Sequence, residues 1–538
     1  MDRPGAEALM VADAVVIGSG PNGLVAANVL ADAGWSVVVL EAAAHPGGAV
    51  RTAELTIPGF RHDLYSAFHP LAAASPVIDA LGLEHYGLRW RHAPGVLAHV
   101  FPDDRSVLLS RDVERTAESV GSFAAQDAAA WRAEYARYLD VRDDLIRALL
   151  RPFPPVRAGL GLLTTLGVAE ALRAMRVATM PVRRYGEERF AGEGARILLA
   201  GNAMHTDLGP NQAGSAVFGW LLAMLGQDVG FPVPQGGAGS LTEALVRRLE
   251  SRGGRVECSR PVTKVLVARG KAVGVVAGGD HVRAAKAVLA DVPAPVLYRD
   301  LVGADLLPGT LLDDIANFDW DDSTIKVDWA LSGPIPWRSA AASAAGTVHL
   351  GVDADGLVQV DAELGSGRVP VRPFLLLGQM TTADPSRSPA GTESAWLYSH
   401  VPRGGHWPAE RLATWADGVE DIVATHAPGF RDLVLGRVVS GPRDLQSGNP
   451  SLVDGAINSG TAGIHQQLVF RPTPGIARAD TVIERLFLAS ASAHPGGGVH
   501  GAPGANAARA ALASHSYYGP VYRPLMRGLH RTLHPPKH

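Results

Sequence analysis

The stretch Ala14-Val-Val-Ile-Gly-Ser-Gly-Pro-Asn-Gly23 decides the fold of this chain. A short apolar run leads into glycines spaced Gly18-x-Gly20-x-x-Gly23, and a segment rich in Ala, Val and Leu follows. In such a unit the first glycine permits a tight turn, the second lets the backbone approach a pyrophosphate, and the third lets the helix pack closely against the strand. The first turn of that helix directs free N–H groups towards phosphate. The sequence therefore predicts a strand, a helix and a second strand that bind a dinucleotide.

The residues around this turn extend the predicted nucleotide site. A second apolar run, Val37-Val-Val-Leu40, ends at Glu41, where a carboxylate would accept hydrogen bonds from ribose hydroxyls. Six residues further on, Gly47-Gly48 offers a second close approach of the backbone, and Arg51 adds a cation. An ordinary glycine loop is the alternative for this pair. The neighbouring positions assigned to the same site are Ser19, Pro21, Asn22 and Ala42.

A second glycine cluster lies some 450 residues later. The predicted strand Leu486–Ala489 leads through His494-Pro-Gly-Gly-Gly498 to an Ala-rich helix from about Gly504 to Ser514. Such a turn would aim N–H groups and the helix dipole at the edge of an electron-rich ring and stabilise negative charge there. A mobile loop that caps a core helix is the alternative. A long cofactor would contact both glycine clusters, so both clusters would lie in one nucleotide domain. The chain is therefore predicted to leave this domain and return to it.

The composition is that of a globular protein and argues against several function classes. Hydrophobic residues make up 47% and charged residues 19% of 538 residues, enough for two or three lobes. A net charge of -4 gives no electrostatic case for nucleic acid. The single cysteine, Cys258, excludes an internal disulfide and a cysteine-based metal cluster, so no metal site is predicted, and it fits a reducing cytoplasm. Residues 1–13 lack the pattern of a secretory signal.

Hydrophobic patterning predicts an α/β chain with a discontinuous nucleotide domain. The predicted strands are Val262–Ala268, Lys271–Ala277 and Val282–Leu289 in a meander, and residues 324–332, 346–352, 371–380 and 394–400 in a separate antiparallel sheet. The predicted division is a Rossmann-like cofactor domain (1–70, 231–295 and 455–515), an α+β substrate domain (71–111 and 296–454) with a helical cap (112–230), and a C-terminal tail (516–538).

Together these motifs resemble the flavin-dependent amine-oxidase-like superfamily, and within it the phytoene-desaturase-related oxidoreductases. The resemblance also includes Gly59-Phe-Arg-His-Asp63 and Pro234-Gln-Gly-Gly-Ala-Gly-Ser-Leu241. It implies an FAD cofactor, an adenine contact through the backbone of Val262, and an isoalloxazine ring against Gly497, Gly498 and Val499.

The resulting hypothesis is an FAD-dependent oxidoreductase that dehydrogenates or isomerises a hydrophobic, polyene-like or isoprenoid-like substrate. A second complete nucleotide-binding unit is not evident, because Gly237-Ala-Gly239 follows a Pro-rich loop instead of a strand. Electrons are therefore expected to pass to oxygen, a quinone or another acceptor. An amine or amino-acid oxidase on the same scaffold, and a flavoprotein that serves as a binding or regulatory partner, are the alternatives.

The catalytic candidates are His494 and His205. Hydride removal from carbon needs mainly positioning and at most one base. His494 precedes the second glycine cluster, and His205 belongs to a segment expected to face the substrate lobe. A turn histidine and a core histidine are the respective structural alternatives.

The segment 151–180 is a candidate for membrane contact. Arg151, Arg157, Arg173 and Arg176 flank its apolar turns, which suits a helix lying in a membrane interface. A packed core helix is the alternative. The expected location is the cytoplasm, with peripheral contact at the inner membrane face, and the sequence does not indicate an oligomeric state.

Overall fold

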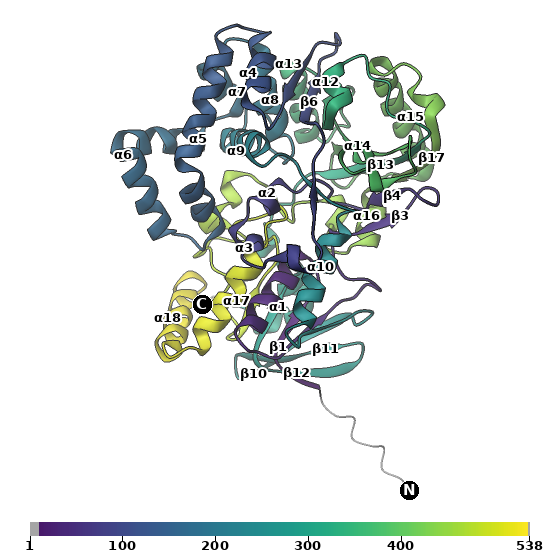
Figure 1. Ribbon diagram of the computed structural model, residues 1–538. Coiled ribbons are helices and arrows are strands. Elements are labelled where there is room, and N and C mark those ends of the chain that lie inside the picture. Colours follow the sequence, from purple (N-terminus) through teal and green to yellow (C-terminus); the bar gives the residue numbers. More distant parts are fainter. Residues whose placement is uncertain (1–9, 536–538) are drawn as a thin grey trace.

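Two seven-stranded sheets, one in each of two lobes, organise the chain (Figure 1). The computed structural model describes residues 10–535, so most of the segment examined for a secretory signal lies outside the described residues. The lower lobe in Figure 1 brings together the amino-terminal elements, the strands around residue 275 and the carboxyl-terminal helices. The chain thus leaves one lobe and returns to it, as predicted.

The lower lobe holds the nucleotide-binding unit. Its sheet has the order β10-β11-β12-β1-β2-β9, and β18 also pairs with β12. β1 pairs in parallel with β2 and with β12, whereas β10, β11 and β12 form the antiparallel meander that the sequence predicted. The elements are β1 Met10–Ile17, α1 Pro21–Asp32, β2 Val37–Leu40, α10 Gly239–Glu250, β9 Arg255–Glu257, β10 Val262–Ala268, β11 Lys271–Ala277, β12 Asp280–Ala290, β18 Leu486–Leu488 and α17 Ala502–His515.

Close packing of α1 explains its small residues. Its Ala26, Ala27 and Leu30 are fully buried with side chains of α17 against one face of the sheet. A Cβ atom on Gly504, in α17, would lie 1.9 Å from the carbonyl oxygen of Asn22. The two helices therefore pack backbone against backbone, which only glycine permits at this distance.

The upper lobe is built on the second sheet, in the order β17-β13-β16-β15-β14-β6-β7. The predicted separate sheet is confirmed, with one parallel pair, β14 with β6, among antiparallel neighbours. β15 begins at Leu375 instead of residue 371, because Pro370 and Pro373 lack the N–H groups that a ladder needs. The elements are β6 Gly95–Val100, β7 Ser106–Leu109, β13 Ser323–Leu331, α12 Ala340–Ala344, β14 Ala345–Leu350, β15 Leu375–Gln379, β16 Glu393–Val401, α15 Ala409–His426 and β17 Val434–Ser440.

The two faces of this sheet have different partners. Val327, Trp329 and Leu397 belong to a buried cluster that also contains residues of α12 and α15. The opposite face points towards the helical cap, which the sequence predicted within residues 112–230. The cap and its neighbour consist of α4 Val113–Gly121, α5 Asp127–Leu150, α6 Val156–Thr179, α7 Val182–Arg189, α8 Glu193–Ala203, α9 Ser215–Asp228 and α13 Ala354–Gly365.

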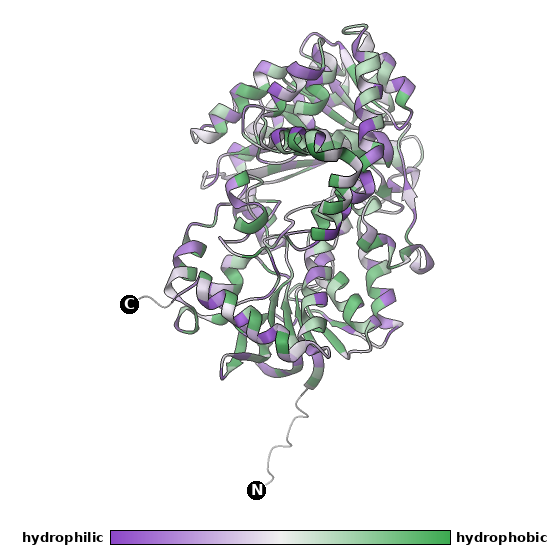
Figure 2. Ribbon diagram, turned by 90° about the vertical axis from the view of Figure 1, so that its left-hand side faces the viewer, coloured by the Kyte–Doolittle hydropathy of each residue, from purple (hydrophilic) through white to green (hydrophobic). Residues whose placement is uncertain are grey.

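Helix α6 departs from the expectation of a packed core helix. Of its residues only Ala158 is buried, and Val168 and Met175 are more than 60% exposed. The helix is kinked at Gly167, whose φ is +71°. Figure 2 turns this side of the molecule to the viewer. The core-helix alternative is therefore wrong, because α6 stands out from the cap and has solvent on most sides.

Two further segments pack differently from what the domain boundaries suggest. Residues between 72 and 88, including α2 Pro70–Ala73 and α3 Pro76–Asp79, form a core with α1 and α10 of the nucleotide lobe. The segment predicted as a tail contains α18, Gly519–Leu533, beside α17 (Figure 1). The remaining short elements are β3 Thr52–Glu54, β4 Arg61–Asp63, β5 Trp90–Arg91, β8 Val233–Pro234, α11 Gly309–Ala316, α14 Met380–Ala383 and α16 Pro442–Gly448.

Candidate functional site

A cavity of about 580 Å³ lies between the two lobes. Its floor is the carboxyl edge of β1, β2 and β12, where Ile17, Leu40 and Asp291 line it. Its roof is the inner face of the second sheet, and α9 supplies one side wall. In open parallel sheets ligands bind at this edge, so the position agrees with a nucleotide site.

Most of the residues predicted to bind the cofactor line this cavity. The lining residues among them are Gly18, Gly20, Pro21, Asn22, Glu41, Ala42, Gly48, Val262, Gly497, Gly498 and Val499. Two glycine clusters that are distant in the sequence therefore border one cavity. The contact of Val262 with adenine and of residues 497–499 with an isoalloxazine ring stay predictions.

The backbone of the floor leaves no room for side chains. A Cβ atom on Gly20 would lie 2.6 Å from Oδ2 of Asp291, and one on Gly48 would lie 2.9 Å from Cα of Gly20. Gly18 has a φ of +88°, which favours glycine. The cradle is thus made of main chain at the amino-terminal end of α1, the arrangement that holds phosphate.

Glu41 is oriented by hydrogen bonds at the end of β2. Its Oε2 accepts from the backbone N–H of Ser19 at 2.8 Å and from Oγ of Ser19 at 2.6 Å. Its Oε1 accepts from the N–H of Ala43 at 2.8 Å. The carboxylate keeps lone pairs for a further donor, which fits its predicted role towards a ribose.

Asp291 is a residue of the floor that sequence reasoning missed. Its Oδ2 accepts from the N–H of Gly23 at 2.8 Å. Burial, and next the charge of Glu41, raise the pKa of Asp291 to about 7. The sequence could have indicated Asp291, because this residue lies two positions after the predicted strand Val282–Leu289. In the structure that strand runs parallel to β1.

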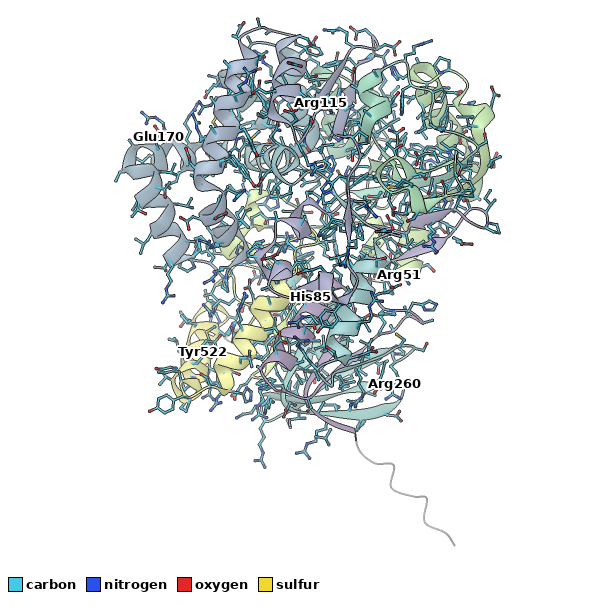
Figure 3. All side chains as sticks on the ribbon, in the orientation of Figure 1. Arg51, His85, Arg115, Glu170, Arg260 and Tyr522 are labelled. Carbon is cyan, nitrogen blue, oxygen red and sulfur yellow. The ribbon has the colours of Figure 1, made fainter. Side chains whose placement is uncertain are left out.

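Four predicted cofactor residues act behind the lining. Ser19 binds Glu41, and the N–H of Gly47 donates to the carbonyl of Ser19 at 3.1 Å. At Gly23 a Cβ atom would lie 2.2 Å from the carbonyl oxygen of Gly18. Arg51 donates to the hydroxyl of Tyr65 at 3.0 Å and lies at the junction of the lobes (Figure 3). Ser19, Gly23, Gly47 and Arg51 therefore support the lining without forming it.

His494 lies outside the residues that line the cavity. Its Nε2 donates to the carbonyl of Arg151 at 2.9 Å, between α5 and α6. Burial, and also the charge of Arg471, lower its pKa. The geometry gives this ring a structural contact, and its predicted catalytic role stays a prediction.

The roof carries polar and aromatic side chains that the sequence did not single out. Register places Lys326 of β13 opposite Tyr398 of β16, and Trp396 is two residues away on the same face. Lys326 forms a buried ion pair with Asp328, whose Oδ1 lies 3.5 Å from Nδ1 of His62. Burial would raise the pKa of Asp328, but the ammonium of Lys326 and the contact with His62 together outweigh burial and lower it. The pair is therefore charged and internally compensated.

His205 reaches the cavity from the end of α8. Its Nε2 is 2.7 Å from Nε2 of His349, which lies on β14. Burial, and next the neighbouring His400, lower the pKa of His205 to about 3, and burial lowers that of His349 well below its ordinary value. Both rings are therefore neutral at pH 7, and in the contact between them one Nε2 donates a hydrogen bond that the other accepts.

The chain belongs to the flavin-containing amine oxidoreductase family, whose pattern matches residues 22–393. It is 30% identical to the rat (Rattus norvegicus) pyridine nucleotide-disulfide oxidoreductase domain-containing protein 2 over 92% of each chain. It is 27% identical to a zeta-carotene-forming phytoene desaturase of Myxococcus xanthus over 90% of each chain. The structure of putrescine oxidase bound to putrescine superposes with a TM-score of 0.59 at 20% identity, covering 94% of this chain and 98% of that one.

These likenesses confirm the predicted resemblance and the α/β fold class. The protein is a flavin-dependent oxidoreductase of the amine oxidase and phytoene desaturase family. The glycine cradle and Glu41 fit the nucleotide portion of such a cofactor. Within residues 10–535 no group of three or more His, Cys, Asp or Glu side chains is arranged to hold a metal ion.

Proposed function

We propose that the protein is an FAD-dependent oxidoreductase that dehydrogenates or isomerises a hydrophobic substrate. The observation that carries this proposal is the continuity of one cavity from the glycine cradle to the apolar wall of α9. When bound there, FAD accepts a hydride from carbon. FAD is favoured because two glycine clusters border the cavity, as a long cofactor requires.

The wall of α9 suits an apolar substrate. Phe218, Leu221, Leu222 and Leu225 line the cavity, and Phe231 adds a further ring after the helix. These side chains exclude water from the space above the floor. Substrate would be held by burial of its apolar surface, at roughly 25 cal/mol for each Å² removed from water.

His205 is the proposed proton acceptor of the cavity. It lines the space that α9 encloses, and its low pKa keeps the ring neutral. A neutral ring has a lone pair for a proton released from substrate, although its low pKa makes this ring a weak base, and contact with His349 fixes its orientation. Electrons would leave to oxygen, a quinone or another acceptor, since a second strand–turn–helix nucleotide unit is not evident in the sequence.

The test begins with the purified protein. We expect a flavin absorbance spectrum, and release of FAD instead of FMN on denaturation. Under anaerobic conditions, apolar polyene or isoprenoid substrates should bleach that spectrum. Leu221→Trp, which fills the space beside α9, should slow bleaching at least about tenfold, whereas Leu139→Trp on the exposed side of α5 should not. A protein that neither contains FAD nor is reconstituted with it would refute the proposal.

An amine oxidase activity is the second candidate. The indole of Trp396 and the ring of Tyr398 stack at 5.8 Å with an angle of 19° between their planes, and both line the cavity. Such a pair could enclose an uncharged amine. Release of hydrogen peroxide with an amine panel, without bleaching by polyenes, would favour this candidate. A flavin that no lipid or amine reduces, together with a co-purifying protein, would favour a binding role.

We also propose that α6 contacts the inner face of a membrane from the cytoplasm. α6 is the one helix among residues 10–535 that is long and apolar enough to cross a membrane, although its kink and its arginines suit a helix lying in the interface. Its exposed apolar residues are Val156, Leu160, Leu163, Val168, Leu172 and Met175. Glu170 projects from its outer end in Figure 3, where it pairs with Arg173.

Vesicle sedimentation tests this contact. The protein should bind phosphatidylglycerol vesicles, and Leu160→Glu together with Leu172→Glu should weaken binding at least about tenfold. Leu139→Glu, on exposed α5, is the control. A stable dimer that is lost on the same α6 substitutions, with no vesicle binding, would assign the surface to a second copy instead.

A further inference from the structure

Several buried polar atoms in the lining of the cavity lack partners, among them one on the roof and one on α8. Oγ1 of Thr347 and Oδ1 of Asn202 are buried, and no hydrogen bond reaches either atom. Both residues line the cavity, and their relative exposures are 1% and 0%. An unpaired buried polar group costs about 1 to 3 kcal/mol, so two of them in one site call for a ligand or water that satisfies them.

The hydrogen bond that the side chain of Asn202 makes shows whether its unpaired atom is the amide oxygen or the amide nitrogen. The side-chain nitrogen of Asn202 donates to the carbonyl of Leu198 at 2.8 Å. Because a carbonyl oxygen cannot donate, this amide atom must be the nitrogen, and the unpaired atom is the oxygen. Asn202 therefore offers an acceptor to the cavity, whereas the hydroxyl of Thr347 can donate.

Both residues lie around the histidine pair. Thr347 and His349 occupy the same face of β14 two residues apart, a spacing of about 7 Å along a strand. A Cβ atom on Gly201, beside Asn202, would lie 2.6 Å from Nδ1 of His349. We call Asn202, His205, Thr347 and His349 the polar corner.

The polar corner carries no net charge. Burial lowers the pKa of both His205 and His349, so both rings are neutral at pH 7. Lys326 and Asp328, a charged pair on this face of β13, compensate each other. A carboxylate or an ammonium group placed here would add an uncompensated buried charge.

The opposite wall is apolar. Phe218, Leu221 and Leu222 of α9 line the same cavity and offer no side-chain hydrogen-bonding group. A molecule that fills the cavity therefore meets hydrocarbon on one side and a neutral donor and acceptor at one corner.

We propose that the substrate is an apolar alcohol, whose hydroxyl accepts from Thr347 and donates to Asn202 while its chain packs against α9. This inference rests on the proposed function and deepens it. A hydrocarbon would leave both atoms unpaired, and an ether or ketone would satisfy only Thr347. A hydroxyl group satisfies both atoms at once without bringing a charge, whereas an amine, which can also donate and accept, is an ammonium group in water at pH 7 and would first have to lose its proton.

Ligand titration of the FAD-loaded enzyme tests the proposal. Farnesol, its methyl ether and farnesene share one chain and differ in the ability to donate and accept. Binding is followed by the change in flavin absorbance under anaerobic conditions. Farnesol should bind at least about tenfold more tightly than the ether and farnesene. Equal affinities, or an absence of farnesol binding, would overturn the proposal.

Two variants connect the preference to the polar corner. Thr347→Val keeps the shape of the side chain, and Asn202→Leu removes the acceptor. Each should reduce the preference for farnesol over farnesene to less than about threefold. Thr425→Val, on the exposed side of α15, should retain the full preference. A preference that survives both variants of the polar corner would overturn the proposal, because water would then be satisfying these atoms.

The outcomes separate this inference from the proposed function. A protein without FAD, or one that no apolar substrate reduces, contradicts the proposed function. An FAD-containing enzyme that farnesene reduces, and that binds farnesol no better than farnesene, contradicts only the assignment of an alcohol.

Discussion

The floor and the roof of the cavity are built in opposite ways. The floor consists of main chain, and added Cβ atoms at Gly20 and Gly48 would lie 2.6 to 2.9 Å from neighbouring atoms. The roof consists of side chains such as Lys326, Thr347 and Trp396, which come from three strands of one sheet. A site made of backbone depends on the absence of side chains, whereas a site made of side chains depends on strand register.

This difference separates cofactor binding from substrate choice. The floor presents main chain and two carboxyl groups, Glu41 and Asp291, which suit a ribose and a phosphate. The roof presents a compensated ion pair, two neutral histidines and unpaired oxygen atoms, which can discriminate between substrates. We therefore expect substitutions in the floor to remove flavin, and substitutions in the roof to change stability or selectivity with flavin retained.

The largest effect is expected for Gly23→Ala in the floor. Its Cβ atom would lie 2.2 Å from the carbonyl oxygen of Gly18, so α1 and the turn must separate. We expect more than about 90% loss of bound flavin, measured by absorbance at equal protein concentration, or failure to fold. Gly418→Ala in α15 is the control, because no atom lies within 4 Å of its added Cβ. Full flavin occupancy in Gly23→Ala would contradict the backbone account of the floor.

The next effect concerns the ion pair of the roof. Lys326→Met leaves the carboxylate of Asp328 buried, with Nδ1 of His62 3.5 Å away. Removing one partner of a buried pair costs about 3 to 5 kcal/mol, which denaturation of the FAD-loaded enzyme by urea would measure. The double variant Lys326→Met with Asp328→Leu should recover most of this loss. If the single variant is as stable as the native enzyme, the charges of Lys326 and Asp328 do not compensate each other in the folded protein.

Sequence reasoning recovered the floor because the floor is local. The turn Gly18–Gly23, the strand ending at Glu41 and the meander after Val262 follow from residue order over short distances. The roof escaped prediction because strand register, set by the folded sheet, places Lys326 opposite Tyr398. Asp291 was missed for a similar reason, since only the parallel pairing of β1 with β12 brings it beneath Gly20.

Three further features show where one sequence property is compatible with two structures. Hydropathy alone could not tell whether α6 is buried, and the structure exposes it. Proximity to the second glycine cluster suggested that His494 is catalytic, but nearness along the chain does not fix the direction of a ring. The residues at 72–88 were assigned to the substrate domain, whereas their apolar side chains are buried against α1 and α10.

The third prediction uses Asp291, the carboxyl group of the floor. Burial, and next the charge of Glu41, raise its pKa from 3.8 to about 7 in the folded protein. The stability that the protonated group contributes is therefore present below pH 3.8 and is lost as the pH rises to about 7. Each pKa unit corresponds to about 1.4 kcal/mol, so the loss is at most about 4 kcal/mol.

Asp291→Asn should remove this dependence. As the pH rises from 5 to 8, the melting temperature of the variant should rise relative to that of the native enzyme. Thermal unfolding of both proteins at several pH values measures it, and Asp355→Asn, on exposed α13, is the control. A constant difference across this range would show that Asp291 is not the group that titrates.

The smallest effect is expected for His494→Ala, which tests whether the structural contact or the sequence motif describes this residue. The ring donates one hydrogen bond, to the carbonyl of Arg151 at 2.9 Å. Loss of such a bond costs about 1 kcal/mol, so the melting temperature should fall slightly and turnover should change less than about threefold. His205→Ala, in the cavity lining, should lower kcat/KM at least about tenfold with flavin retained. The opposite ranking, a large loss of turnover in His494→Ala with an unchanged melting temperature, would mean that the second glycine cluster moves its histidine into the site when substrate binds. The comparison of these two histidines therefore decides whether the cavity lining or the second glycine cluster supplies the proton acceptor.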